Sequence, residues 1–335
     1  MENIYIGDYM NIRETIEERE KEILSPYATK SAETRGRERY EEKCEIRTEF
    51  QRDRDRIMYS KAFRRLKHKT QVFLSPEGDH YRTRLTHTLE VSQIARSIAR
   101  ALGLNEDLTE AVALGHDLGH TPFGHAGEKA LNNICPYGFK HNEHSLRVVD
   151  VLEKTGGLNL TQEVRNGILC HTGSQKAFTL EGQIVALSDK IAYINHDIDD
   201  AIRGGVLVET DLPKKFTDVL GENHSKRINT MIWAVVKESD NKPQIGMDTE
   251  IYDAMMGMRQ FLFENVYISS EPKIEERKAK HIIEGLYEAY LKNPDLIPNN
   301  ESDIHSSIRD YIAGMSDRYA VSKYSEIYIP KFWNL

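Results

Sequence analysis

A helical spacing of apolar residues dominates the chain from residue 84 onward and most constrains its fold. The segment 84–102 carries apolar side chains every three or four positions and ends at Gly103, as an amphipathic helix does. Glycine and proline then separate further segments with the same period. These predict helices at 107–118, 126–134, 142–154, 161–171, 180–203, 223–238, 248–268, 272–292 and 301–321. The sequence therefore predicts an all-α fold.

The first 83 residues predict a different mixture of elements. Residues 12–24 and 50–66 have rough apolar stripes and are expected to be helical. Residues 71–74 favour a strand, 75–78 a turn, and 80–84 a returning strand, which together make a small β-hairpin. The sequence thus adds one short hairpin to the helical fold.

The chain is expected to divide into three parts. Residues 1–45 form a polar N-terminal arm rich in Glu and Arg, within which 25–39 is expected to be extended or mobile. Residues 46–210 form a histidine-rich core, and residues 211–335 form a second helical region. A single small core cannot accommodate 335 residues.

Composition excludes several classes of protein. Hydrophobic residues make up 39% and charged residues 29%, as in ordinary globular proteins. No apolar run reaches the roughly 20 residues of a membrane span, and residues 1–10 show no signal segment, so a cytoplasmic protein without membrane contact is expected. Three separated cysteines do not form a disulfide framework. A net charge of −8 argues against general nucleic-acid binding.

Seven of the thirteen histidines lie between His80 and His144, which indicates a site rather than chance. His116 and Asp117 end a predicted helix just before a glycine-rich turn, where neighbouring side chains can converge. His87 follows the buried stripe of its helix and needs a polar partner there. A lone histidine of this kind is usually a hydrogen-bonded core residue. Beside the His116-Asp117 pair, however, it becomes a candidate metal ligand.

Asp189 is the fourth candidate ligand. On the predicted helix 180–203 it shares a stripe of side chains four apart with Tyr193 and Asp197. The alternative is a solvated face. Small apolar neighbours and a tyrosine between two aspartates favour a site. The residues alone therefore predict metal-assisted phosphoester hydrolysis and nothing finer.

Around these residues the sequence resembles the HD-domain superfamily, whose signature is a histidine, a later His-Asp pair and a distant aspartate. The longer motifs resemble the deoxyguanosine triphosphate triphosphohydrolase (dGTPase) family. They are RDRDRIMYSKAFRRLKHKTQVF at 52–73, RTRLTHTLEV at 82–91, HDLGHTPFGHAGE at 116–128, HNEHS at 141–145 and SDKIAYINHDIDDA at 188–201. The resemblance covers roughly residues 45–210 and extends weakly into 261–267. It implies an HD-domain helical bundle with a small β-hairpin and additional C-terminal helices.

The resemblance implies a role for each matching position. The metal ligands would be His87, His116, Asp117 and Asp189, and the catalytic pair would be His125 and Glu128. Phosphates would meet Arg84, His120, His141 and Lys190. Gln71 and Asp197 would hold the sugar 3′-hydroxyl, and Tyr193 would exclude a 2′-hydroxyl. The family reaction releases a deoxynucleoside and intact triphosphate.

The chemistry of these side chains fits those roles. Two imidazoles and two carboxylates suit Mn, Fe, Co, Ni or Zn better than Mg alone, although family members commonly work with Mg or Mn. Glu128, three residues after His125, is placed to orient that histidine as a general base or acid. Arg84, one helical turn before His87, is the strongest candidate for a phosphate contact.

Other readings remain open at this point. The chain is alternatively another HD-domain phosphohydrolase, such as a nucleotidase or phosphodiesterase, or a non-catalytic nucleotide- or DNA-binding regulator. The resemblance implies a homo-oligomer, from dimer to hexamer, and a dNTP substrate with dGTP favoured. Base preference is not readable from the residues, and no motif supports single-stranded DNA or a regulatory nucleotide as a partner.

Overall fold

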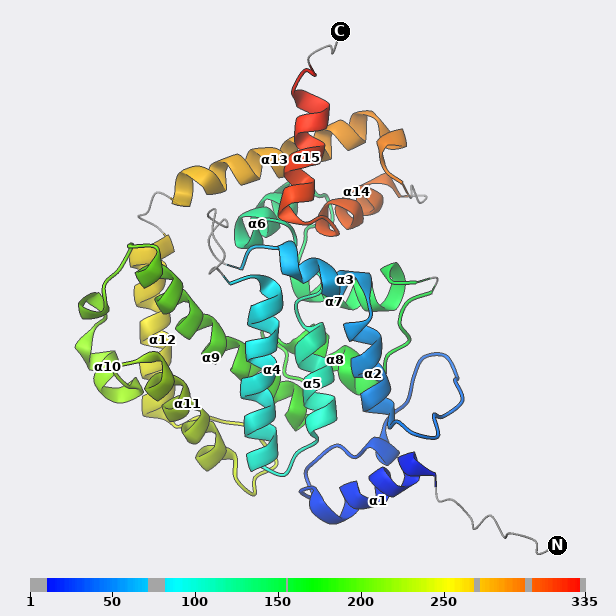
Figure 1. Ribbon diagram of the computed structural model, residues 1–335, viewed down its shortest axis with the longest axis vertical. Coiled ribbons are helices and arrows are strands. Elements are labelled where there is room, and N and C mark those ends of the chain that lie inside the picture. Colours follow the sequence, from blue (N-terminus) through cyan, green and yellow to red (C-terminus); the bar gives the residue numbers. More distant parts are fainter. Residues whose placement is uncertain (1–10, 72–81, 155, 268–271, 299–302, 332–335) are drawn as a thin grey trace, which may run out of the picture.

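The computed structural model describes residues 11–71, 82–154, 156–267, 272–298 and 303–331 (Figure 1). Within these ranges the regular elements are helices, so the all-α prediction is confirmed. The α-helices are α1 (Ile12–Ile23), α2 (Glu49–Met58), α3 (Lys61–Arg65), α4 (Arg84–Ala101), α5 (Glu106–Gly115), α6 (Gly124–Ile134), α7 (His141–Arg147), α8 (Gln162–Cys170), α9 (Leu180–Arg203), α10 (Lys214–Leu220), α11 (His224–Ser239), α12 (Thr249–Leu262), α13 (Pro272–Lys292), α14 (Ile304–Ala313) and α15 (Asp317–Tyr328). Short 3-10 or π turns occupy Ser31–Glu33, Leu66–His68, Val148–Leu152, Glu209–Asp211, Phe263–Tyr267 and Pro294–Leu296.

Helices α4, α5 and α9 form the centre of the larger hydrophobic core. Helix α4 packs against α5 and α9, while α2 and α8 contact α5 (Figure 1). Val91 and Ile98 from α4, Leu108 from α5, and Ile191 and Ile198 from α9 are completely buried. Burying one such side chain contributes about 1.5–3 kcal/mol. This packing holds rigid the three helices that carry the candidate metal ligands.

Helix α4 begins at Arg84, as the predicted helix 84–102 does, and it overlaps the predicted return strand 80–84 at that one residue. The Thr83 side chain accepts a hydrogen bond from the backbone N–H of Thr86, and the Thr86 side chain accepts one from the backbone N–H of Thr83, which makes a capping box. Arg84 is therefore the first helical residue rather than the end of a strand. Thr70 and Thr83 form an isolated antiparallel bridge. The rest of the predicted hairpin, residues 72–81, lies outside the described residues.

The structure divides two of the predicted helices and adds one that the sequence did not predict. The predicted helix 50–66 is broken between α2 and α3, because the Ser60 side chain caps a new helix by accepting from the backbone N–H of Phe63. The predicted helix 301–321 is also two helices, since α14 ends at Gly314 and Ser316 caps α15. Helix α10 was not predicted, because its seven residues show too short an apolar pattern.

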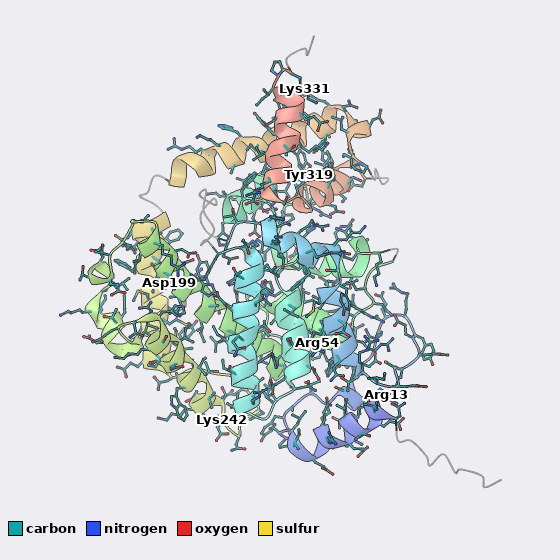
Figure 2. All side chains as sticks on the ribbon, viewed as in Figure 1. Arg13, Arg54, Asp199, Lys242, Tyr319 and Lys331 are labelled. Carbon is teal, nitrogen blue, oxygen red and sulfur yellow. The ribbon has the colours of Figure 1, made fainter. Side chains whose placement is uncertain are left out.

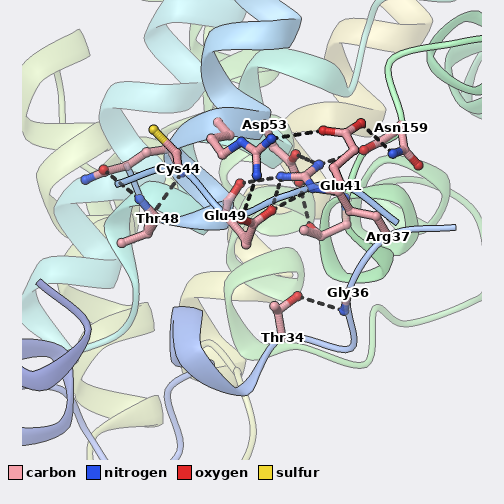
Figure 3. Close-up of polar contacts among 12 residues, drawn as sticks. Thr34, Gly36, Arg37, Glu41, Cys44, Thr48, Glu49, Asp53 and Asn159 are labelled. Carbon is pink, nitrogen blue, oxygen red and sulfur yellow. Dashed lines mark hydrogen bonds and ion pairs between the residues drawn. The ribbon is translucent and has the colours of Figure 1, made fainter. Parts of the chain in front are cut away.

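The N-terminal segment packs against the core and is not the solvated connector that its composition allowed. Arg37 donates from Nε to Glu49 Oε2 at 2.6 Å and also pairs with Asp53 (Figure 3). The other carboxylate oxygen of Asp53, a fully buried residue, accepts from the backbone N–H of Thr161 at 2.8 Å. Buried ions need this degree of pairing. The network ties residues 34–53 to the start of α8.

Ion pairs also join helices across the surface of the larger core. Arg54, labelled in Figure 2, extends from α2 to Asp107 and Glu110 on α5, at 2.8 and 3.2 Å.

Among the described residues, none of the helices is both long enough and apolar enough to cross a membrane.

Helices α6, α13, α14 and α15 enclose a second hydrophobic cluster (Figure 1). Two side chains connect it to the loop before α6. The buried Lys69 donates to the carbonyl oxygens of His120 and Ala313. Asp317, the first residue of α15, accepts from the backbone N–H groups of Thr70 and Phe123, each at 2.9 Å. The C-terminal helices therefore support the histidine-rich loop directly.

Candidate metal centre and cleft

The four predicted metal ligands converge from α4, α9 and the end of α5. The Nε2 atom of His87 lies 3.0 Å from Asp189 Oδ1 and 3.9 Å from Asp117 Oδ2. The Nε2 atom of His116 lies 3.5 Å from Asp117 Oδ2 and 3.8 Å from Asp189 Oδ1. His87, His116 and Asp117 thus offer ligand atoms that all lie within 4.8 Å of one another, and Asp189 Oδ1 lies within 4 Å of both imidazole nitrogens, a donor set that suits a divalent metal.

The protonation states of these side chains fit a metal. The Nδ1–H of His116 donates to the carbonyl oxygen of Ala113 at 2.6 Å, so Nε2 is the ring nitrogen that faces the candidate site. That Nε2 atom is buried and has no hydrogen-bond partner within the described parts of the chain. Burial opposes ionisation of Asp117, but His116, His120 and Arg84 outweigh it and hold the pKa of Asp117 well below its usual value. An orphaned imidazole nitrogen beside an ionised carboxylate is what a bound cation would satisfy.

Asp117 is also held by two neighbours expected to meet phosphates. Arg84 donates from its guanidinium to Asp117 Oδ2 at 2.8 Å, and His120 Nε2 lies 3.1 Å from Oδ1. Burial and the nearby charge of Arg84 lower the pKa of His120, so this imidazole is neutral at neutral pH. Arg84 is itself only 1% exposed and reaches the site from inside the core.

The ligands open into a cleft of about 310 Å³. Its lining brings together imidazoles, carboxylates and three cationic side chains, Arg84, Lys190 and Arg259. The full lining is Gln71, Arg84, His87, Asp117, His120, His125, His141, His171, Thr172, Asp189, Lys190, Tyr193, Met256 and Arg259. A chain with net charge −8 therefore has a local cationic wall that suits an anionic ligand.

The loop that carries the histidines is shaped by close backbone packing. A Cβ atom on Gly119 would lie 2.1 Å from the backbone nitrogen of Ser145 at α7. Phe123 adopts a left-handed conformation, with φ of 64°, immediately before α6. The turn between α5 and α6 thus folds back tightly enough to place His120 and His125 on the same cleft.

The predicted catalytic pair is looser than expected. His125 Nδ1 lies 3.8 Å from Glu128 Oε2, and the His125 side chain is 60% exposed. Glu128 instead accepts from the backbone N–H and Nδ1 of His141. His141 stacks on His120, with ring centroids 4.0 Å apart. Glu128 therefore positions His141 in this structure, while His125 projects into the cleft.

The three residues predicted to contact the sugar do not all lie in the cleft. Gln71 and Tyr193 line the cleft, and the Tyr193 ring lies 6.3 Å from that of His125. Asp197 is completely buried on α9 and does not belong to the described residues that line the cleft. The stripe Asp189–Tyr193–Asp197 therefore splits, with two members facing the cleft and the third inside the core.

Sequence reasoning missed several residues of the site. His171, at the end of α8, has its Nε2 atom 3.2 Å from that of His141, and burial together with His116 lowers its pKa to about 4. Thr172 follows it, and α12 adds Met256 and Arg259. A further buried histidine, His196, lies behind His87 with their Nδ1 atoms 3.1 Å apart. The residue pattern alone contained no signal for Arg259.

Comparison with known proteins identifies the class to which this fold and site belong. The HD domain family matches residues 84–194, which contain all four candidate ligands. The phosphohydrolase-associated domain family matches residues 245–326, which include Met256 and Arg259 of the cleft wall. The fold and the His/Asp cluster therefore define an HD-domain phosphohydrolase.

Similarity to curated proteins extends over nearly the whole chain. A deoxyguanosinetriphosphate triphosphohydrolase-like protein of Caldanaerobacter subterraneus subsp. tengcongensis is 61% identical over 331 residues, covering 97% of this chain and 98% of that protein. One from Clostridium perfringens strain SM101 is 53% identical over 339 residues, with 96% and 99% covered. The chain belongs to the deoxyguanosinetriphosphate triphosphohydrolase-like family of HD-domain proteins.

A solved structure shares the fold at lower identity. The crystal structure of a hypothetical protein from Aquifex aeolicus is 21% identical and superposes with a TM-score of 0.50. The match covers 81% of this chain and 67% of that one.

Proposed function

We propose that the chain is a metal-dependent dNTP triphosphohydrolase that converts a deoxynucleoside triphosphate and water into a deoxynucleoside and inorganic triphosphate. The observation that carries this proposal is the convergence of His87, His116, Asp117 and Asp189 beside a cleft with a cationic wall. The names of the similar proteins support the substrate class. Because these names specify deoxyguanosine triphosphate, dGTP is the favoured substrate.

A divalent cation held by the four ligands would polarise a phosphoryl oxygen and neutralise charge that develops during water attack. The chain's own cations would hold the rest of the triphosphate. Arg84 and Lys190 from α4 and α9, with Arg259 from α12, line one continuous cleft. Glu128 overcomes the effect of burial and raises the pKa of His141, which favours the charged form of this imidazole. These groups would bind and orient the phosphates.

His125 is the proposed proton-transfer group. Its side chain is exposed to the cleft rather than committed to a close hydrogen bond, so it can approach the leaving 5′ oxygen or the attacking water. Breaking the bond between the α-phosphorus and the 5′ oxygen requires a proton for the departing deoxynucleoside. His125 would deliver that proton, and water would supply the hydroxyl added to the triphosphate.

Tyr193 is the proposed sugar discriminator. Its ring lines the cleft one helical turn beyond Asp189 and faces the His125 ring edge-on. A ring packed at the 2′ carbon rejects a ribonucleotide by steric conflict. Gln71, which also lines the cleft, is a candidate partner for the 3′-hydroxyl. Asp197 is completely buried on α9 and is not among the described residues that line the cleft.

A product analysis tests the proposed reaction. The four dNTPs and GTP are incubated with the full chain in Mn²⁺, in Mg²⁺ and in EDTA, and both products are identified. The expected result is metal-dependent formation of deoxynucleoside and triphosphate in equal amounts, with little reaction of GTP. Nucleoside monophosphate with pyrophosphate would instead identify a different HD-domain phosphohydrolase. The expected homo-oligomer, from dimer to hexamer, is measured separately by light scattering.

A further inference from the structure

The metal-facing histidine of α4 makes a polar contact through each ring nitrogen. The Nε2 atom of His87 faces Asp189 Oδ1 at 3.0 Å, on the side of the candidate metal. Its Nδ1 atom lies 3.1 Å from Nδ1 of His196 on α9. The two rings are almost perpendicular, at 84°. Both residues are 1% exposed, so water does not substitute readily for either contact.

His196 continues the chain of contacts away from the metal. Its Nε2 atom pairs with Oε2 of Glu90, which lies on α4 one turn beyond His87. Glu90 also accepts from Nε of Arg82 at 3.2 Å. Arg82 reaches back to α9 through Asp199, labelled in Figure 2, at 3.3 Å and through Asp200 at 3.1 Å. Through these contacts Arg82, Glu90 and His196 link α4 and the residue before its N-cap to α9 at two places.

The hydrogen positions along this chain follow from which groups can donate. A metal on Nε2 of His87 leaves that ring a single N–H, at Nδ1, which must find an acceptor. The Nδ1 atom of His196 is the neighbour at hydrogen-bonding distance. His196 can accept there only if its own proton is at Nε2. Glu90 accepts a hydrogen bond from that Nε2–H, since His196 and Arg82 outweigh burial and lower the pKa of Glu90.

We propose that Arg82, Glu90 and His196 form a positioning chain that fixes the ring orientation and tautomer of His87 for metal binding. The inference rests on the proposed metal-dependent function and adds three residues to its site. Arg82 and Glu90 act through His196, and His196 acts through His87. These contacts hold α4 and α9 together behind His87 and Asp189, the candidate metal ligands that the two helices contribute.

Metal affinity of the full chain tests this role without depending on turnover. Mn²⁺ is titrated calorimetrically into metal-free wild type, His196→Phe and His196→Asn. Phe keeps a ring but removes the acceptor, so the dissociation constant is expected to rise about tenfold or more. Asn places a carbonyl oxygen near the former Nδ1 position and is expected to recover most of the affinity. His144→Phe removes a buried imidazole outside the cleft and should leave the affinity unchanged.

The tautomers provide a second measurement that does not require a variant to fold. In ¹⁵N-histidine-labelled wild type with Zn²⁺, ring ¹⁵N shifts should show His87 protonated at Nδ1 and His196 at Nε2. His196 protonated at Nδ1, or a folded His196→Phe chain with wild-type Mn²⁺ affinity, would overturn the positioning chain alone. A wild-type chain that binds neither metal would overturn the proposed function as well.

Discussion

Glu128 accepts two hydrogen bonds from His141, one from its backbone N–H and one from Nδ1, each at 2.9 Å. Burial disfavours charge on both side chains, yet Glu128 raises the pKa of His141, and His125 together with His141 lowers the pKa of Glu128. Because the pKa of His141 is higher in the folded than in the unfolded protein, its protonation stabilises the fold. This stabilisation is fully present below the unfolded pKa of roughly 6.5 and is lost as the pH rises through the folded pKa. The lowered pKa of Glu128 adds stability above roughly pH 4.3, which is lost as pH falls.

Glu128→Gln should therefore destabilise the metal-free protein in a pH-dependent way. At about pH 6 the charged hydrogen bond is present, and its loss should cost about 1.5–3 kcal/mol. At about pH 9 the loss should be smaller, because His141 is then neutral in the wild type as well. Urea unfolding of both proteins at the two pH values measures the difference. An equal loss at both would show that His141 carries no charge in the folded protein.

His125→Ala should abolish turnover without weakening the fold. The side chain is 60% exposed, so its removal creates no cavity, whereas loss of a proton-transfer group lowers kcat by about 10²–10⁴-fold. Nucleotide binding should persist. Single-turnover kinetics and calorimetric binding measure the two effects, with His281→Ala, a 75% exposed histidine on α13, as the control. A normal kcat in the His125 variant would remove this residue from the reaction.

Tyr193→Ala should relax the choice between deoxyribose and ribose. If the ring excludes the 2′-hydroxyl, its removal raises kcat/KM for GTP relative to dGTP by about tenfold or more. The ratio is measured by competition between the two substrates. Tyr59→Ala, at a 74% exposed position, should leave the ratio unchanged. An unaltered ratio in the Tyr193 variant would place sugar selection elsewhere in the cleft.

Arg37→Ala should be far more destabilising than loss of a surface arginine. It leaves the fully buried Asp53 without its ion-pair partner, which costs about 3–5 kcal/mol in such sites. Arg47→Ala breaks a half-exposed pair with Asp55 and a side-chain contact with Cys44, and should cost about 0–1 kcal/mol. The two free energies of unfolding are compared by urea titration. Similar small losses would mean that the N-terminal segment contributes little to the fold.

The helices and the metal ligands were the most predictable features. Long helices such as α4 and α9 follow from apolar spacing over five or more turns. The breaks at Ser60 and Gly314 depend on single capping residues and were missed. The four candidate ligands could be proposed from the sequence because each has a chemical signature: a histidine on a buried stripe, a His-Asp pair and an aspartate between small residues. In the structure each of the two carboxylates has an oxygen within 4 Å of both imidazole nitrogens, and their role as metal ligands stays a prediction.

The remaining parts of the site depend on tertiary packing that local patterns do not encode. Arg259 reaches the cleft because α12 packs against α9, although the two helices lie far apart in sequence. The sequence analysis did not single out His171 or His196, because only the folded structure brings them next to His141 and His87. Glu128 was paired with the nearer histidine in sequence, whereas the turn before α7 brings His141 closer.

The position of a bound metal tests the central claim most directly. Crystals grown with Mn²⁺ and measured at its absorption edge should show one anomalous peak within about 2.0–2.3 Å of His87 Nε2, His116 Nε2 and carboxylate oxygens of Asp117 and Asp189. Two neighbouring groups offer alternatives, namely Asp117 with His141 and His171, and His120 with Glu128 and His141. A peak confined to either alternative, or none at saturating Mn²⁺, would contradict the proposed centre.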